Sequence, residues 1–205
     1  EGRYPDKSTN TTDLYNFAVW MNGVNGDAAR FATEKWEHFK IYPMAAYYCY
    51  LMRHAAADQL VKNAMLTSED GEKFYFILYD NDTINGLNNI GEIDILPTDD
   101  RNSVDASGQY KFAGHSSVLW NMLEGDAEFM SIVKEVDNAL YSAGISYNEC
   151  IRIFDAEQAD KWVERVYNQD SEYKYVGPYV NNGINNLEML QGKRDLQMSG
   201  AAGYI

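Results

Sequence analysis

Apolar residues recur at the spacing of α-helices over the first 57 residues of the chain. Three helices are predicted there, because residues at i, i+3, i+4 and i+7 share one helix face. Asp27 is expected to cap the second helix, and Pro43 suits the first turn of the third, where a missing N–H costs nothing. The residues expected to face the core are, helix by helix, Leu14, Phe17, Ala18 and Met21; Ala28, Phe31, Ala32 and Phe39; and Ile41, Met44, Tyr48, Leu51, Met52 and Ala55.

The pattern changes from helical to extended after Asn63. The apolar runs AMLT and KFYFILY flank the polar stretch SEDGE. Its Asp70-Gly71 pair predicts a β-hairpin, because glycine adopts a positive φ without strain. Antiparallel pairing around this turn joins residues whose numbers sum to about 141, which sets Asn63 opposite Leu78.

The second half of the chain returns to helical spacing after a loop-like stretch from Asn81 to Gly114. Helices are predicted at Ser116 to Leu123 and from Asp126 onward. Ser146 to Glu149 fits a capping box, and a last helix is expected from about Ile184 to Arg194. No repeat or linker divides the pattern, so residues 1–205 are predicted to form one domain of the α+β class, mainly helical, with a central β-hairpin.

Composition narrows the classes of partner. The formal net charge is −14, from 31 acidic and 17 basic residues. Such a chain repels phosphate backbones and anionic lipid surfaces, so nucleic acid and membrane are not expected partners. The two cysteines, Cys49 and Cys150, form no CxxC motif and have no His nearby at the spacing of metal ligands. They are interpreted as buried thiols. No signal peptide or transmembrane segment is visible, and the missing initiator Met suggests a piece of a longer protein.

Three oxygen-bearing side chains are expected to meet at the open end of the hairpin. Asp58 and Asn63 have the spacing D-x-x-x-x-N, and Asp80 follows the second strand. Phosphoryl transfer uses a carboxylate that accepts the proton of the attacking hydroxyl and hard oxygen ligands that hold Mg²⁺. In kinase-type sites these groups occur in this order, with a hairpin between the Asn and the second Asp. Lys62 is a candidate to steady a phosphate, although a solvated lysine is the commoner role.

The segment DQLVKNAMLTSEDGEKFYFILYDNDTING, Asp58 to Gly86, resembles the core of the CotH family of spore-coat protein kinases. SSVLWNMLEGDAEFMSIVKEVDNAL, ISYNECIRIFDAEQADKWVERVYNQD and LEMLQGKRDLQ resemble its later helices, so the likeness runs from about Asp27 to Leu196. YDNDTINGLNNIG and AGHSSVLW look most similar to CotH-like domains of bacteriophage tail and other virion proteins.

The resemblance implies a kinase-like large lobe that uses Mg²⁺ and ATP. Asp58 would be the catalytic base, and Asn63 and Asp80 would hold Mg²⁺, with Asp82 as a further ligand or support. The sequence shows no small nucleotide-binding lobe. The residues before Asp58 have a helical pattern, and no lysine among them is placed to pair with the nucleotide phosphates. Expected partners are other proteins: the parent polypeptide, and virion or surface proteins.

Two function classes stay open. One is a CotH-type kinase acting on Ser or Thr; the other is a virion structural or assembly module with little or no activity. In a purely structural interpretation Asp58 ends a helix and Asn63 binds the loop backbone. A calcium loop starting at Asp80 fails, because Ile84 and Asn85 occupy the positions that need an oxygen ligand and Gly. The acidic loop holding Asp94, Asp99, Asp100 and Asp105 is interpreted as solvated.

Overall fold

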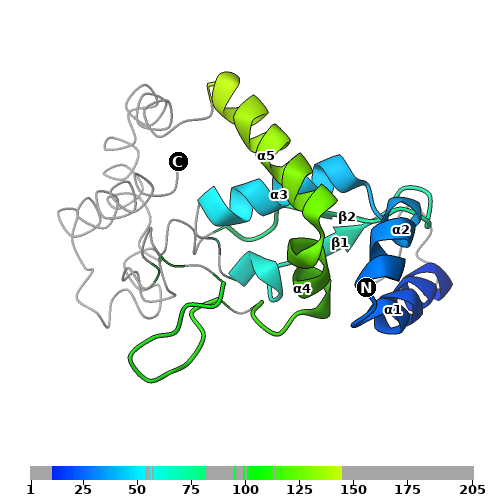
Figure 1. Cartoon of the computed structure of the whole chain (residues 1–205), viewed down its shortest axis with the longest axis horizontal. Helices are drawn as coiled ribbons and strands as arrows, with labels where there is room; N and C mark the ends of the chain where they lie inside the picture. Colours follow the sequence, from blue (N-terminus) through cyan, green and yellow to red (C-terminus); the bar gives the residue numbers. More distant parts are fainter. Residues whose placement is uncertain are drawn as a thin grey trace, which may run out of the picture.

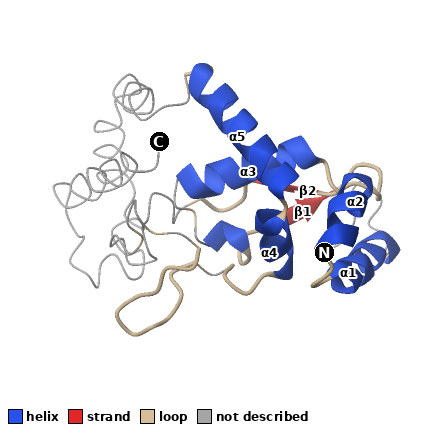
Figure 2. Cartoon of the chain, viewed as in Figure 1, coloured by secondary structure: helices blue, strands red, loops and turns tan. Residues whose placement is uncertain are grey.

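The computed structural model describes residues 11–53, 56, 58–81, 95, 99, 101–112 and 114–144. In this part the chain is mainly helical, with one two-stranded antiparallel sheet (Figure 1 and Figure 2). The elements in chain order are α1 (Thr12–Val24), α2 (Ala28–His38), α3 (Ile41–Arg53), the short 3₁₀ helix η1 (Asp58–Leu60), β1 (Met65–Thr67), β2 (Tyr75–Ile77), α4 (Val118–Gly125) and α5 (Ala127–Ser142). The mixed, mainly helical class predicted from the pattern is confirmed for these residues.

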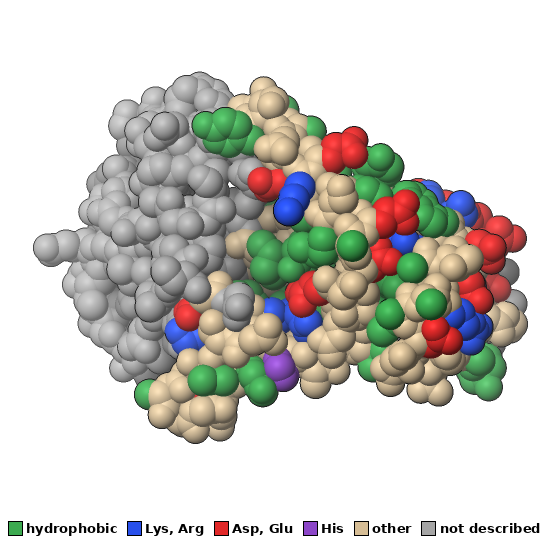
Figure 3. Space-filling view, viewed as in Figure 1, with side chains coloured by type: hydrophobic (Ala, Val, Ile, Leu, Met, Phe, Trp, Pro, Cys, Tyr) green, Lys and Arg blue, Asp and Glu red, His purple; other side chains and the backbone are tan. Residues whose placement is uncertain are grey.

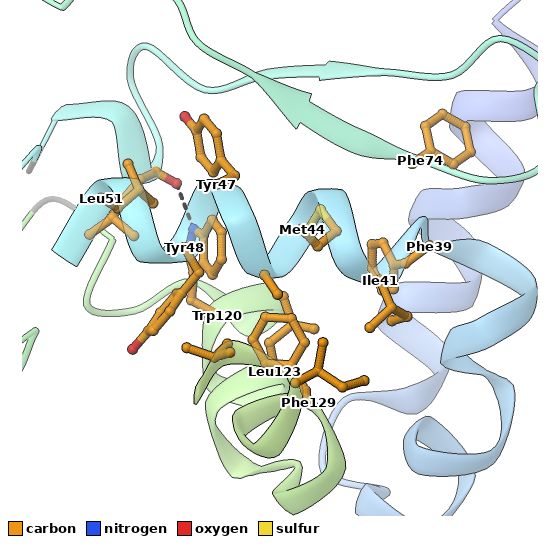
Figure 4. Close-up of a cluster of buried hydrophobic side chains, with 14 of the residues drawn as sticks. Phe39, Ile41, Met44, Tyr47, Tyr48, Leu51, Phe74, Trp120, Leu123 and Phe129 are labelled. Carbon is orange, nitrogen blue, oxygen red and sulfur yellow. Dashed lines mark hydrogen bonds between the residues drawn. The ribbon is translucent and has the colours of Figure 1, made fainter. Parts of the chain in front are cut away.

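Helix α3 is the centre of the core. Figure 4 shows it between the hairpin on one side and α4 and α5 on the other. Tyr47 stacks on Phe76 of β2 with ring centroids 5.2 Å apart, and Tyr48 meets Phe129 of α5 edge-on at 6.1 Å. A helix with neighbours on two sides is apolar around most of its surface. This is why Ala45, Tyr47 and Cys49 are buried in addition to the predicted face.

The core face of α1 is confirmed in part: Phe17 and Met21 are buried as predicted, and the other two predicted residues are not. Leu14 is 51% exposed and Ala18 is also exposed. The buried residues of this helix are Phe17, Trp20, Met21 and Val24. They have the same helical spacing, three positions further along. Aromatic rings bury the largest apolar area, and Trp20 stacks on Phe31 of α2 at 6.0 Å, so the aromatic residues decide which face turns inward.

Helix α2 starts as predicted, but its buried face does not consist of the expected alanines. The Asp27 side chain accepts a hydrogen bond from the N–H of Arg30 at 3.0 Å, which confirms the N-cap. Phe31 and Phe39 are buried, whereas Ala28 and Ala32 are exposed. The position between the two phenylalanines on this face, one turn after Phe31, is a buried lysine.

That lysine, Lys35, joins α2 to the start of α5. Its side chain is fully buried, and Nζ lies 3.2 Å from Asp126 Oδ2 and 2.6 Å from Glu128 Oε2. Nζ also donates to the Ala32 carbonyl at 2.9 Å. A buried ammonium group needs such partners, because desolvating it alone costs several kcal/mol. Asp126 at the same time caps α5 by accepting from the N–H of Phe129 at 2.7 Å.

A second buried cation, Arg101, fastens the loop before α4. Its guanidinium binds both carboxylate oxygens of Glu124, at 2.8 and 2.6 Å. It also donates to the carbonyls of Gly114 and His115 and to the side chain of Asn121. This loop therefore has a defined path up to α4. Elsewhere acidic and basic side chains lie interspersed over the face seen in Figure 3.

The hairpin forms, with a register one residue away from the predicted one. Met65 pairs with Ile77, Leu66 with Phe76 and Thr67 with Tyr75. Continuing this pairing sets Asn63 opposite Tyr79 instead of Leu78. Gly71 has the expected positive φ, 81°. The shift arises in a turn wider than two residues, where Asp70 Oδ1 accepts from the N–H groups of Glu72 and Lys73.

Helices α4 and α5 confirm the predicted return of helical structure. Ser117 caps α4 and Asp126 caps α5. The predicted capping box at Ser146 to Glu149 and the last predicted helix lie outside the described residues, as do Ala55 and Cys150. Within the described part of the chain, no helix is both long and apolar enough to cross a bilayer.

Candidate functional site

The turn from Asp58 to Asn63 is held in place by the helices around it. The Tyr47 hydroxyl of α3 donates to the Gln59 carbonyl at 2.7 Å, and the Trp120 indole of α4 donates to the Leu60 carbonyl at 2.8 Å. Both bonds are buried. Inside the turn, the Asn63 N–H donates to the Asp58 carbonyl at 3.0 Å. The segment that carries three predicted site residues, Asp58, Lys62 and Asn63, is thus fixed to the helices around it.

The end of the hairpin meets this turn at Asp80. Asn63 Nδ2 lies 3.4 Å from the main-chain oxygen of Asp80, and Gln59 Nε2 donates to the same oxygen at 2.5 Å. The hairpin therefore brings Asn63 and Asp80 together, as its geometry predicted, through a contact of side chain with main chain. A cation shared by these residues stays a prediction.

Asp80 has an uncommon backbone conformation. Its φ is 51°, the left-handed region, and it is the one residue other than glycine with a positive φ among those described. Asp is among the residues that tolerate this region, at a modest cost. Its side chain is exposed. A constrained main chain with an exposed carboxylate is a suitable arrangement for presenting a ligand.

Asp58 lies at the surface end of the turn, beside a lysine. Its side chain is 24% exposed, and Oδ2 lies 3.0 Å from Nζ of Lys62, which is 60% exposed. The two residues stand one helical turn apart, so a local ion pair is favoured. The ammonium group of Lys62 therefore pairs with the carboxylate of Asp58, the predicted base. Because most of the Lys62 side chain is exposed, an anion can also reach it.

The remaining acidic candidates divide into two groups. Asp82, Asp94 and Asp100 lie outside the described residues, as does His54. Asp99 binds Lys111 at 2.6 Å, and Asp105 accepts from the N–H groups of Ser107 and Gln109. In the described part of the acidic loop, these two carboxylates therefore accept hydrogen bonds from donors within the protein.

The donor set of the candidate site suits a hard cation. Carboxylate and amide oxygens are the ligands that Mg²⁺ takes in proteins. Asn63 and Asp80 are the residues expected to hold it, with Asp82 as the further ligand named by the sequence. Among the described residues, no three His, Cys, Asp or Glu side chains cluster closely enough to form a metal site by themselves.

The burial of three polar residues was not foreseen: Gln59 at the site, and Lys35 and Arg101 elsewhere in the core. Lys35 continues the face of Phe31 and Phe39 at intervals of four residues, and this spacing is a usable signal. Gln59 and Arg101 lie in polar stretches without helical or strand periodicity, so nothing in the neighbouring sequence indicates that they are buried. Both are nevertheless among the buried polar side chains of the described chain, at 0% and 4% exposure.

Comparison with family models, with curated proteins and with solved structures found no match to this chain. The likeness to the CotH family therefore rests on the quoted motif residues alone and stays a prediction.

Proposed function

We propose that this chain is a CotH-like kinase-fold module that serves as a structural or assembly domain of a bacteriophage virion, with little or no phosphoryl transfer of its own. The observation that carries the proposal is the meeting of the turn at Asp58 to Asn63 with the hairpin end at Asp80. This proximity of the turn to the hairpin end is consistent with the D-x-x-x-x-N, hairpin and Asp order, although the contact runs from side-chain amides to the main chain of Asp80.

The surroundings of the two lysines that precede Asp58 in the described chain support low activity. A kinase pairs a lysine with the nucleotide phosphates. Lys35 is enclosed between Asp126 and Glu128. Lys40 pairs with Glu69 and lies over the Tyr75 ring, 5.0 Å from its centroid. Both ammonium groups are thus engaged by the protein itself, and the residues described before Asp58 form three helices.

An active protein Ser/Thr kinase, of which this is the large lobe, is the second candidate. The same juxtaposition favours it, together with the partial exposure of Asp58. In that case Asp58 would orient the acceptor hydroxyl and take its proton. Lys62, which lies beside Asp58, would then be near the phosphate that this hydroxyl attacks. Mg²⁺, when bound at Asn63 and Asp80, neutralises phosphate charge. ATP would need a further lysine from elsewhere in the parent polypeptide.

Two measurements distinguish these functions. Mass spectrometry of purified virions should find the parent polypeptide at a fixed copy number per particle if the assembly function holds. A radiolabel assay with Mg-ATP and a Ser/Thr protein acceptor should then show no transfer. Transfer that Asp58→Ala abolishes and Gln109→Met leaves intact would favour the kinase, and absence from purified particles would refute the virion role.

A further inference from the structure

Gln59 reaches across the candidate site although sequence and function assign it no role. Its side chain is fully buried, and Nε2 donates to the main-chain oxygen of Asp80 at 2.5 Å, across 21 positions of sequence. The main chain of Gln59 is itself fixed, since its carbonyl accepts from the Tyr47 hydroxyl. Gln59 therefore connects the helical core to the end of the hairpin.

The residue that Gln59 binds is the one with the left-handed backbone. Asp80 has a φ of 51°, a region that is unfavourable for most residues other than glycine. Such a conformation persists when surrounding contacts determine it. Two amides, from Gln59 and Asn63, donate to the Asp80 carbonyl. The Gln59 bond is the shorter of the two and the better restraint.

The oxygen of the Gln59 side-chain amide does not contribute to stability. Oε1 is buried, and no donor among the described residues reaches it. An unpaired buried acceptor destabilises the folded state, because it loses its hydrogen bonds to water without replacement. Exchanging the amide's oxygen and nitrogen would place Oε1 against the Asp80 carbonyl, so the orientation follows from the hydrogen bond. An apolar side chain of similar volume would avoid the unpaired oxygen, but it would release Asp80.

We infer that Gln59 is a positioning residue: it holds the main chain of Asp80 in the left-handed conformation and so fixes the direction in which the Asp80 carboxylate leaves the backbone toward a divalent cation. The part of this inference that concerns cation affinity rests on the proposed site, whereas the part that concerns the Asp80 backbone does not. Groups that orient a ligand from behind change metal affinity by about 10- to 100-fold when they are removed.

The test compares Gln59→Met with the wild-type chain. NMR measures the one-bond coupling between Cα and its proton in Asp80, which separates a positive from a negative φ, and Mn²⁺ binding is titrated as the probe of the site. Gln59→Met should change the coupling toward that of a negative φ and weaken Mn²⁺ about 10- to 100-fold. Gln109→Met makes the same chemical change on the exposed loop and should alter neither quantity.

A second variant keeps the test valid if Gln59→Met does not fold. Gln59→Glu preserves the volume, and its carboxyl group can donate to Asp80 only when protonated. The coupling of Asp80 should therefore move toward the wild-type value as pH falls. An unchanged coupling in both variants overturns the inference. If the wild-type chain binds no Mn²⁺, the cation site fails, and the coupling alone still decides whether Gln59 positions Asp80.

Discussion

The indole N–H of Trp120 donates to the main-chain carbonyl of Leu60 over 2.8 Å, so α4 supports the turn that carries Asp58 and Asn63. The bond is buried and joins positions 60 residues apart. It makes the geometry of the candidate site depend on a helix that contributes none of its proposed ligands.

Trp120→Phe is expected to test this dependence. Phenylalanine keeps an aromatic ring but leaves the Leu60 carbonyl without its donor, which should lower the free energy of unfolding by about 1–3 kcal/mol. Chemical denaturation with urea measures the loss. The matched control is Trp36→Phe, whose indole bonds to the exposed carboxylate of Glu128 and where the loss should stay below about 0.5 kcal/mol. Equal losses in both variants would contradict the special role of the Leu60 bond.

Gly114 provides a second route to the same turn. A Cβ at this position would lie 2.6 Å from the Leu60 Cβ, closer than real side chains approach. Gly114→Ala should therefore push Leu60 away and cost about 1–3 kcal/mol, as overpacking does. Gly125→Ala is the control, because nothing lies within 4 Å of its Cβ and alanine favours the helix by about 1 kcal/mol.

The pair Gly114→Ala and Leu60→Gly distinguishes contact from backbone effects, because only glycine at position 60 removes the Cβ that the new methyl group would meet at 2.6 Å. If the contact causes the loss, the second substitution relieves it, and the double variant should be more stable than the sum of the single losses implies. Strict additivity in thermal unfolding would show that Gly114 is needed for another reason.

The sequence predicted the elements with local signals and the meeting of Asn63 with Asp80. Asp27 caps its helix, a helix follows Asp126, and Gly71 forms the turn, as predicted, because these features depend on neighbours within four residues. The register moved by one residue because Asp70 organises a wider turn than Asp-Gly alone implies. Asn63 and Asp80 could still be placed together, since a hairpin fixes which ends of its strands meet.

The tertiary contacts of individual side chains could not be predicted from the hydrophobic pattern. Leu14 and Phe17 have equivalent helical spacing, but only Phe17 packs into the aromatic cluster with Phe39 and Phe74. Gln59 has no partner nearby in sequence; its burial follows from the position of Asp80, 21 residues later. Local periodicity carries no information about such contacts. Whether Asp58, Asn63 and Asp80 share an ion stays a prediction.

Lys35 gives a prediction about stability away from the site. Lys35→Met retains much of the side-chain volume but leaves the buried Asp126 without its cation. Removing one partner of a buried pair costs about 3–5 kcal/mol. Guanidinium denaturation should show a lowered midpoint with an unchanged slope. Arg30→Met, which breaks the solvent-screened pair with Glu34, is the control, and its midpoint should move far less.

Asp70 gives a prediction about pH. Hydrogen bonds from the N–H of Lys73 and then of Glu72, with one from the Ser68 hydroxyl, lower the pKa of its carboxyl group from 3.8 to about 2. A group whose pKa is lower in the folded state stabilises above its unfolded pKa and loses that contribution as pH falls through the folded value. The stability that Asp70 adds should therefore be complete above about pH 4 and disappear toward pH 2.

Asp70→Asn isolates this contribution, because asparagine does not titrate. The difference in unfolding free energy between the wild-type chain and the variant should shrink as pH falls from about 4 to 2 and stay constant above this window. NMR titration of the Asp70 carboxyl carbon checks the pKa directly. A midpoint near 3.8 would mean that the backbone N–H groups do not bind the carboxylate in solution, and would contradict this prediction.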